Sequence, residues 1–383
     1  MHKIAVVTAT RAEYGLLSPV IKALRAREND ILKIELIVTG THLSDSYGRT
    51  ISQIDDRIDH EIPVPVKSDS EADISANQAN VLVKFTDLFL RERYDAVVLL
   101  GDRYETLAIA IAAGNTRTPI FHLCGGDTTE GALDEWIRHS ITKISYLHFV
   151  TNEESQKRVI QLGEDPARVF NFGSTSIDNI LTVADMGKEE ALASIGLGDC
   201  RYALCTYHPV TMEGGSVDGQ VAEFLEAIKG MDDLEFIVTK SNADQGGARI
   251  NELLDKAGEE IGNLHVFTSL GVRRYLSLMK YAEFVLGNSS SGIVETPAFH
   301  VPTVNIGDRQ RGRLQAASII NCGADRGSIT AAMEKARSDA FRAVCRETGS
   351  LYGSGNAGER IAQKAVEVVM AGGIDLKKKF YDL

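Results

Sequence analysis

Short apolar runs alternate with amphipathic stretches along the whole chain, and this alternation constrains the fold more than any other feature. The runs that we interpret as strands are residues 4–7, 34–38, 96–100, 120–123, 147–150, 203–205, 235–238, 265–267, 284–286 and 303–306. Amphipathic stretches, for example residues 17–26 and 79–90, lie between them. Strands that alternate with helices are typical of parallel sheets flanked by helices. The sequence therefore predicts an α/β protein.

The chain has 383 residues, which is too long for one ordinary core, so we expect two domains of roughly 150–200 residues each. The strand and helix pattern restarts after a seam that begins near residue 173. We therefore predict doubly wound domains at 1–173 and 174–383, and a last helix at about 356–371. Ligands of such sheets bind at the carboxyl ends of the strands.

Composition narrows the classes of function. The formal net charge of −12 argues against a nucleic-acid binder. We recognise no signal peptide and no membrane span, and the five cysteines are scattered without a CxxC pair. We therefore expect a cytoplasmic protein with reduced thiols and no metal site.

A Gly/Ser loop follows the run at 284–286 and is the most informative local motif. It begins with Gly287, continues with Asn288, Ser289, Ser290 and Ser291, and precedes a segment that can be helical. Backbone N–H groups, hydroxyls and a helix N-terminus together suit a phosphate. Glu295 would lie about one turn into the helix, where a carboxylate could bind ribose hydroxyls. The alternative is an ordinary polar loop in which Glu295 supports the start of the helix.

Polar residues also follow the strands of the first half. Arg11 comes after the first strand and could pair with a diphosphate, or with a neighbouring carboxylate such as Glu13. Asp102 comes after the run at 96–100, where it could act in catalysis or cap the next helix.

The segment after the run at 120–123 is glycine-rich and acidic. It contains Gly125-Gly126, Asp127, Glu130, Asp134 and Glu135, followed by Arg138-His139, which could orient Asp134. Neighbouring carboxylates raise one another's pKa, which suits acid/base work. The alternative is a solvated acidic loop that caps a helix.

Two further segments of the second half carry cationic groups. His208 follows the run at 203–205 and precedes a proline, which suits a diphosphate or catalytic contact. Arg309, Arg311 and Arg313 alternate after the run at 303–306. We expect them to face a nucleotide diphosphate, although some could balance an acidic surface.

Taken in order, these motifs resemble the UDP-N-acetylglucosamine 2-epimerases, and the resemblance runs nearly end to end. The motifs are residues 10–15, 101–103, 125–127, 138–139, 208–209, 287–292 and 307–310. The chain is most similar to the hydrolysing bacterial branch, which makes N-acetylmannosamine for sialic acid synthesis. The resemblance implies a GT-B fold, that is, two Rossmann-like domains with the last helix crossing back to the first. It also implies a homodimer or homotetramer that needs neither metal nor cofactor.

The resemblance also implies a mechanism. Loss of the C2 proton and of UDP in an anti elimination gives a 2-acetamidoglucal, which water then hydrates. Asp102 and Asp134 match family carboxylates, and Arg11, His208, Ser289, Ser290 and Arg309 match diphosphate-binding positions. Glu295 matches the ribose-binding glutamate. We add Ser291 and Arg313 as UDP-binding residues, and His208 also as a catalytic residue.

One position departs from some relatives, which have glutamate directly before the Gly-Gly pair where this chain has Cys124. We therefore expect Asp127, directly after the glycines, to serve as the third acid. Three alternatives remain for the activity. They are the same reaction on UDP-2,4-diacetamido-2,4,6-trideoxyglucose in the legionaminic acid pathway, a GT-B glycosyltransferase, and a sensor that binds UDP-sugars without turnover.

Overall fold

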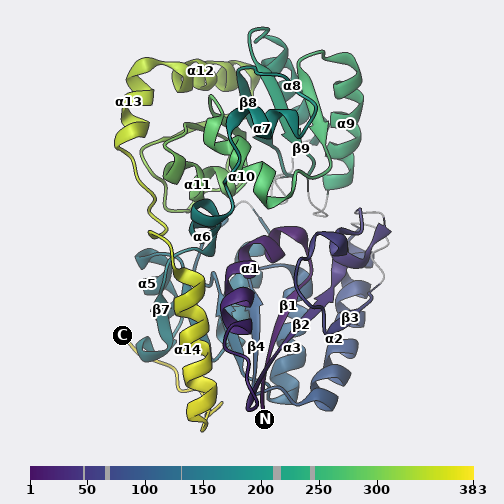
Figure 1. The fold of residues 1–383 in the computed structure, drawn as a ribbon, viewed down its shortest axis with the longest axis vertical. Coiled ribbons are helices and arrows are strands. Elements are labelled where there is room, and N and C mark those ends of the chain that lie inside the picture. The colour runs from purple at the N-terminus through teal and green to yellow at the C-terminus, as the bar shows by residue number, and fades with distance from the viewer. Residues whose placement is uncertain (46–47, 65–69, 131, 210–216, 242–245) are drawn as a thin grey trace. The chain divides into compact units, whose positions relative to one another are not determined.

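The structure is a computed structural model that describes residues 1–45, 48–64, 70–130, 132–209, 217–241 and 246–383. It consists of two compact units, each built on its own parallel sheet (Figure 1). The first unit contains Met1–Asp127, Leu133–Asp178 and Tyr352–Leu383. The second contains Thr128–Ala132 and Asn179–Leu351. The α/β fold with two Rossmann-like sheets is therefore confirmed.

The first unit has a seven-stranded sheet with the order β3-β2-β1-β4-β5-β6-β7. Its strands are β1 (His2–Thr8), β2 (Leu32–Thr39), β3 (His60–Ile62), β4 (Ala96–Leu100), β5 (Ile120–Leu123), β6 (Leu147–Val150) and β7 (Val169–Asn171). Its helices are α1 (Arg11–Arg25), α2 (Glu71–Glu92), α3 (Tyr104–Thr116), α4 (Asp134–Ile144), α5 (Glu153–Gln161) and α14 (Ala357–Ala371), and α6 (Thr175–Thr182) begins in it. The winding reverses between β1 and β4, which are parallel neighbours.

Both faces of this sheet are buried, because alternate residues of each strand point to opposite sides. Ile4 and Val6 of β1 pack with residues of α1 and α14, whereas Ala5 and Val7 pack with residues of α2 and α3. Figure 1 shows α14 running beside α1, although the two helices lie at opposite ends of the sequence. The first unit is therefore a doubly wound sheet that the end of the chain completes.

The last helix is attached to the first unit through its N-terminus. The Asp178 carboxylate accepts hydrogen bonds from the backbone N–H groups of Ala357 (3.0 Å) and Gly358 (2.7 Å). Ser174 donates its backbone N–H to the carbonyl of Tyr352 over 2.7 Å. These contacts place residues 174–178 with the first unit, whereas the sequence analysis put the domain boundary after residue 173.

Lys378 is one of the residues that hold the segment after α14 to the first unit. Lys378 Nζ donates to the carbonyls of Lys143 (2.8 Å) and Ser145 (2.7 Å), at the end of α4, and lies 2.5 Å from Glu164 Oε2. The Phe380 ring lies against Gly163, where a side chain would collide with it. The sequence suggests a solvated end with one aromatic anchor, and most side chains of the tail are indeed exposed, with Lys378 and Phe380 contacting the first unit.

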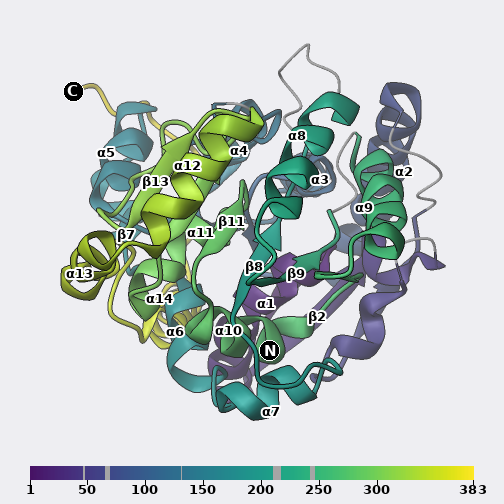
Figure 2. The same cartoon turned by 90° about the horizontal axis from the view of Figure 1, so that it is seen from above.

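The second unit has a six-stranded parallel sheet with the order β10-β9-β8-β11-β12-β13. Its strands are β8 (Tyr202–Thr206), β9 (Glu235–Thr239), β10 (Leu264–Phe267), β11 (Val285–Gly287), β12 (Thr303–Ile306) and β13 (Ile319–Cys322). Its helices are α7 (Lys188–Ala193), α8 (Val217–Lys229), α9 (Gly247–Glu260), α10 (Gly271–Tyr281), α11 (Ser291–Val294), α12 (Arg326–Arg337) and α13 (Asp339–Glu347). Figure 2 shows α8 between α9 and α12, and these three helices cover one face of the sheet. The winding reverses between β8 and β11.

No helix of the described residues combines the length and the apolar character that crossing a bilayer requires.

Candidate active site

Asp102 stands at the switch point of the first sheet, directly after β4. Its carboxylate accepts a hydrogen bond from Arg138 Nε of α4 over 2.9 Å, and a second bond from Arg138 Nη2. The Arg138 side chain is 1% exposed, whereas the Asp102 side chain is 25% exposed. Asp102 therefore has an accessible carboxylate that is held in place by a buried arginine.

Arg138 also joins the other acidic residues of this region. Its Nη1 donates to the backbone carbonyl of Asp127 (2.8 Å) and to Glu135 Oε2 (3.0 Å). Burial lowers the pKa of Arg138, but the charges of Asp102 and Asp127 outweigh this and keep its pKa above the usual value. The guanidinium is thus a permanent positive charge for the acidic segment. The sequence suggests that Arg138 orients Asp134, whereas in the structure its guanidinium binds the carboxylate of Asp102.

Asp127 and Asp134 have different environments. Asp127 is buried, and its Oδ1 accepts hydrogen bonds from Thr151 Oγ1 and Ser155 Oγ, both over 2.7 Å. Asp134 is partly exposed and begins α4. Asp127 is therefore fixed by the hydroxyl groups of Thr151, directly after β6, and of Ser155 on α5. Asp134 lies on the first turn of the helix that carries Arg138.

Arg11 is the first residue of α1 and follows the other strand of the same switch point. Glu13, which the sequence offered as its ion partner, closes a capping box instead. Glu13 Oε2 accepts hydrogen bonds from the backbone N–H groups of Ala9 (2.7 Å) and Thr10 (3.1 Å). Burial raises the pKa of Glu13 to about 7. Glu13 therefore builds the turn that presents Arg11.

Asn288 organises the switch point of the second sheet. Its buried side chain accepts a hydrogen bond from the backbone N–H of His208 (2.7 Å) and donates one to the His208 carbonyl (2.8 Å). Its own carbonyl accepts from Gln310 Nε2 (2.8 Å) and Arg309 Nη1 (3.3 Å). Loops that follow β8, β11 and β12 are thereby tied together. The sequence motif contained Asn288, but nothing local indicated this role.

The serines and His208 have defined partners within the second unit. Ser291 Oγ lies 2.7 Å from the Tyr275 hydroxyl and donates to Ser289 Oγ over 3.1 Å. The ring of His208 is oriented by Ser241 Oγ, 3.0 Å from its Nδ1. The helix that begins after Ser290 has only four residues. The dipole contribution expected from the sequence is therefore smaller, and loop N–H groups and hydroxyls are the main phosphate donors available there.

Glu295 follows this short helix and is partly buried. Burial raises its pKa to about 8. Burial also raises the pKa of Tyr275 to about 12, and the Glu295 charge adds to this effect. A carboxylate that loses its proton near neutral pH is well suited to a ligand that supplies hydroxyl donors.

The three alternate arginines of the sequence do not all face the Ser loop. Arg309 does, whereas Arg311 lies near two carboxylates, 3.4 Å from Glu130 Oε2 and 3.9 Å from Asp308 Oδ2. Arg311 and Arg313 line a cavity of about 710 Å³ at the carboxyl ends of β12 and β13. Arg311 therefore fits the alternative that the sequence left open, in which an arginine balances neighbouring carboxylates.

The segment Thr128–Ala132 belongs to the second unit, although its flanking residues Asp127 and Leu133 belong to the first. The backbone N–H of Glu130 donates to the carbonyl of Arg311 over 3.2 Å. A Cβ atom on Gly312, whose φ is +84°, would lie 2.8 Å from Thr128 Oγ1. Within the second unit, Thr128 and Glu130 are therefore in direct contact with Arg311 and Gly312.

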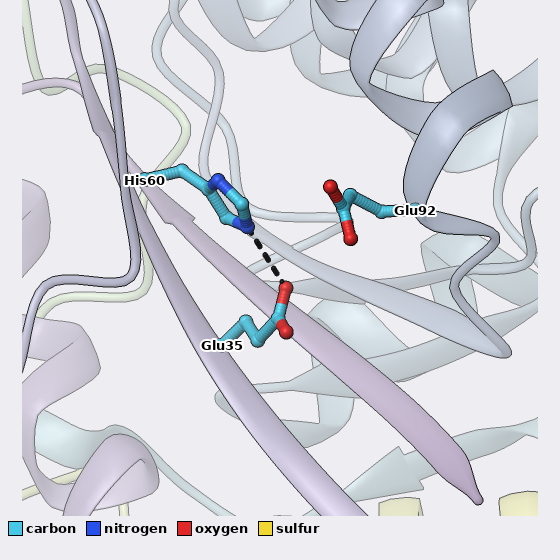
Figure 3. Close-up of side chains that lie close together, drawn as sticks. All are labelled: Glu35, His60 and Glu92. Atoms are coloured by element: carbon cyan, nitrogen blue, oxygen red, sulfur yellow. Dashed lines mark hydrogen bonds and ion pairs between the residues drawn. The ribbon is translucent and has the colours of Figure 1, made fainter.

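One group of metal-type ligands occurs among the described residues, away from these loops. Glu35, His60 and Glu92 bring ligand atoms within 4.8 Å of one another (Figure 3). Lys3 Nζ lies 3.0 Å from Glu92 Oε2, and Lys33 Nζ lies 2.5 Å from Glu35 Oε1. Burial raises the pKa of Glu35, but hydrogen bonds from Lys33, Tyr94 and His60 outweigh it and bring the pKa to about 2. Ammonium groups thus supply the positive charge that a metal would bring.

Comparisons with known proteins identify the family and support the fold. The family model for UDP-N-acetylglucosamine 2-epimerase matches residues 22–365. A GDP/UDP-N,N'-diacetylbacillosamine 2-epimerase (hydrolyzing) from Campylobacter jejuni is 38% identical over 89% of both chains. The polysialic acid biosynthesis protein P7 of Escherichia coli is 36% identical, over 100% of this chain and 98% of its own. The structure of a UDP-GlcNAc 2-epimerase from Neisseria meningitidis, bound to UDP-GlcNAc, superposes with a TM-score of 0.80 at 19% identity, over 96% of this chain and 100% of that one.

Proposed function

The chain belongs to the UDP-N-acetylglucosamine 2-epimerase family, and we propose that it hydrolyses a UDP-linked 2-acetamido sugar with inversion at C2. One observation carries this proposal. In each sheet, candidate residues follow both strands of the switch point, namely Arg11 and Asp102 in the first and His208 and Ser289 in the second. Switch points are where open α/β sheets bind ligands.

The proposed reaction has two steps. A carboxylate removes the C2 proton while the C1–O bond breaks and UDP leaves, which gives a 2-acetamidoglucal. Water then adds to C1, and a proton returns to the opposite face of C2. Because the C2 proton is only weakly acidic, donors to the departing diphosphate must share in the first step. UDP and the free manno-configured sugar are the products.

We assign the proton transfers to Asp102, Asp127 and Asp134. Asp102 is the best supported, because its carboxylate is accessible and backed by a buried guanidinium. The diphosphate would be bound by Arg11, His208, Ser289, Ser290 and Arg309, with Ser291 and Arg313 as further UDP contacts. Glu295 would accept the ribose hydroxyls. UDP and its sugar are the only ligands that this proposal requires, within a homodimer or homotetramer in the cytoplasm.

Two substrates fit the proposal. The sequence resemblance favoured UDP-GlcNAc, giving N-acetylmannosamine for sialic acid-type sugars, and the family model has that name. The Campylobacter relative at 38% identity is named for diacetylbacillosamine instead. We therefore place the UDP-diacetamido-trideoxy sugar first and UDP-GlcNAc second.

Incubation with each UDP-sugar in deuterated water tests the proposal. NMR should show release of UDP and a free manno-configured sugar with deuterium at C2, because that proton exchanges with solvent. A tenfold or larger preference in kcat/KM, which corresponds to about 1.4 kcal/mol, would identify the substrate. Release of unlabelled sugar, or dependence on an acceptor as in a glycosyltransferase, would overturn the reaction.

Two substitutions separate proton transfer from UDP binding. Asp102→Asn should lower kcat by about 10²-fold or more, the usual scale for an acid/base group, with little change in UDP affinity. Arg309→Ala should weaken UDP binding by roughly 1.5–3 kcal/mol, the scale of a charge-assisted hydrogen bond. Wild-type turnover by Asp102→Asn would show that the carboxylate is misassigned.

A further inference from the structure

His122 is a fully buried polar residue of the first sheet that the proposed chemistry does not use. It lies on β5, opposite Leu99 of β4, and its side chain sits within the core. Its Nε2 lies 2.8 Å from the backbone carbonyl of Gly101, the residue directly before Asp102. A ring in this position therefore contacts the backbone that carries the candidate catalytic carboxylate.

The contacts of His122 determine where its proton lies. A carbonyl oxygen can only accept, so Nε2 must carry the hydrogen. Burial lowers the pKa of His122 to about 3, and His148, Asp102 and Arg138 are the charged or titratable groups that act on it. The ring is therefore neutral and Nδ1 is an acceptor. Thr142 of α4, whose Oγ1 lies 3.3 Å from Nδ1, donates to it.

Gly125 has a structural role next to this pair. A Cβ atom there would lie 3.0 Å from both His122 Nδ1 and Thr142 Oγ1. The first glycine of the Gly-Gly pair thus leaves room for the threonine–histidine contact.

Helix α4 consequently contacts the segment around Asp102 twice, once directly and once through His122. Arg138 binds the carboxylate of Asp102, and Thr142, one turn later, acts through His122 on the carbonyl of Gly101. Gly101 has a φ of +81°, a conformation that glycine adopts readily, so no side chain of its own restrains the backbone before Asp102.

We propose that His122 is a positioning residue that fixes the Gly101–Asp102 peptide, so that Asp102 meets both Arg138 and the C2 proton. The expected effect of His122 on catalysis rests on the proposed function, whereas the hydrogen bonds of His122 do not. A small displacement of a catalytic group lowers turnover steeply, whereas UDP would be held mainly by groups of the second unit.

His122→Phe should therefore lower kcat by about 10–10²-fold, with KM and UDP affinity changed less than threefold. His122→Gln should restore part of this loss, because its amide N–H can donate to the Gly101 carbonyl. The matched control is His148→Phe. His148 is the partner of His122 in the register of β5 and β6 and is equally buried, but it bonds to Glu164. His148→Phe should lower the stability of the protein without a comparable fall in kcat. Equal loss of kcat in both Phe variants, or no rescue by glutamine, would reduce His122 to a core residue.

A second measurement does not depend on activity. In protein labelled with ¹⁵N-histidine, with His122 assigned by comparison with His122→Gln, its signals should show an Nε2–H tautomer from pH 5 to 9. Thr142→Val should shift the Nδ1 signal. Titration in this range, or an Nδ1–H tautomer, would overturn the inference even if the enzyme were active. The expected tautomer in a protein that does not turn over UDP-sugars would instead count against the proposed function alone.

Discussion

Two buried side chains, Asn288 and Arg138, hold together groups that the chain itself keeps far apart. Asn288 bonds to the backbone of a residue 80 positions away, and Arg138 bonds to a carboxylate 36 positions away. Each makes several hydrogen bonds in a buried setting, so its loss would leave polar partners unsatisfied. At the residue scale, the geometry of the candidate site therefore depends on buried side chains that are not themselves proposed to bind a ligand.

The raised pKa of Glu295 predicts how UDP affinity depends on pH. If the carboxylate accepts ribose hydroxyls, UDP binds its ionised form and lowers the pKa in the complex. Affinity should then rise roughly tenfold per pH unit below the pKa of about 8, and level off above it. Calorimetry in buffers of different ionisation enthalpy should detect the released proton. Glu295→Gln is the control, and a variant with the wild-type profile would exclude Glu295 as the source.

At the scale of elements, the packing of α14 on α1 depends on a glycine. A Cβ atom on Gly358 would lie 2.8 Å from the carbonyl carbon of Pro19, which is backbone and cannot move aside cheaply. Close approach at this point lets the apolar face of α14 reach the core of the first unit.

Gly358→Ala should therefore destabilise the protein by about 1–3 kcal/mol, the range for overpacking, although alanine is the better helix former. Gly114→Ala in α3 is the matched control. Its Cβ would meet Ile144 at an ordinary 3.4 Å, so it should be neutral or should stabilise. Urea unfolding measures both, and similar free energies of unfolding would show that the α1–α14 contact adapts.

The strands that sequence reasoning missed are also informative at this scale. All the central strands were predicted, but β3, β7 and β13 were not, and each of these lies at an edge of its sheet. A central strand is buried on both sides and needs a continuous apolar run, whereas an edge strand does not. The sequence His60-Glu61-Ile62, for example, has no such run.

The positions of the candidate site residues in the fold were predictable to a similar extent. Residues that follow central strands could be placed from local pattern alone, as for Asp102 and His208. The roles of Arg138 and Asn288 could not be predicted, because these residues act through contacts that no local sequence pattern encodes. The same holds for Thr128–Ala132, whose place in the second unit depends on Arg311 and Gly312.

At the scale of the whole molecule, the first unit is discontinuous, and Lys378 secures its last segment. Lys378→Ala should lower the free energy of unfolding by roughly 1–3 kcal/mol, since charge-assisted hydrogen bonds to two carbonyls and Glu164 are lost. Fluorescence of Trp136, the chain's one tryptophan, reports on the unfolding of this unit.

Lys377 and Lys379, the exposed neighbours of Lys378, provide the control. A Lys377→Ala/Lys379→Ala double variant should change the free energy of unfolding by about 0.5 kcal/mol or less. Equal losses would mean that overall positive charge matters rather than docking.

The discontinuous first unit also imposes an order on biosynthesis. When the ribosome has made residue 351, every strand of both sheets has been translated, yet α14 has not. Until then the side of α1 that contains Pro19 lacks its partner helix. The nascent first unit must therefore wait with apolar surface uncovered while the whole second sheet is synthesised. Translation speed across residues 179–351 consequently sets how long that surface is open to chaperones or to misassembly.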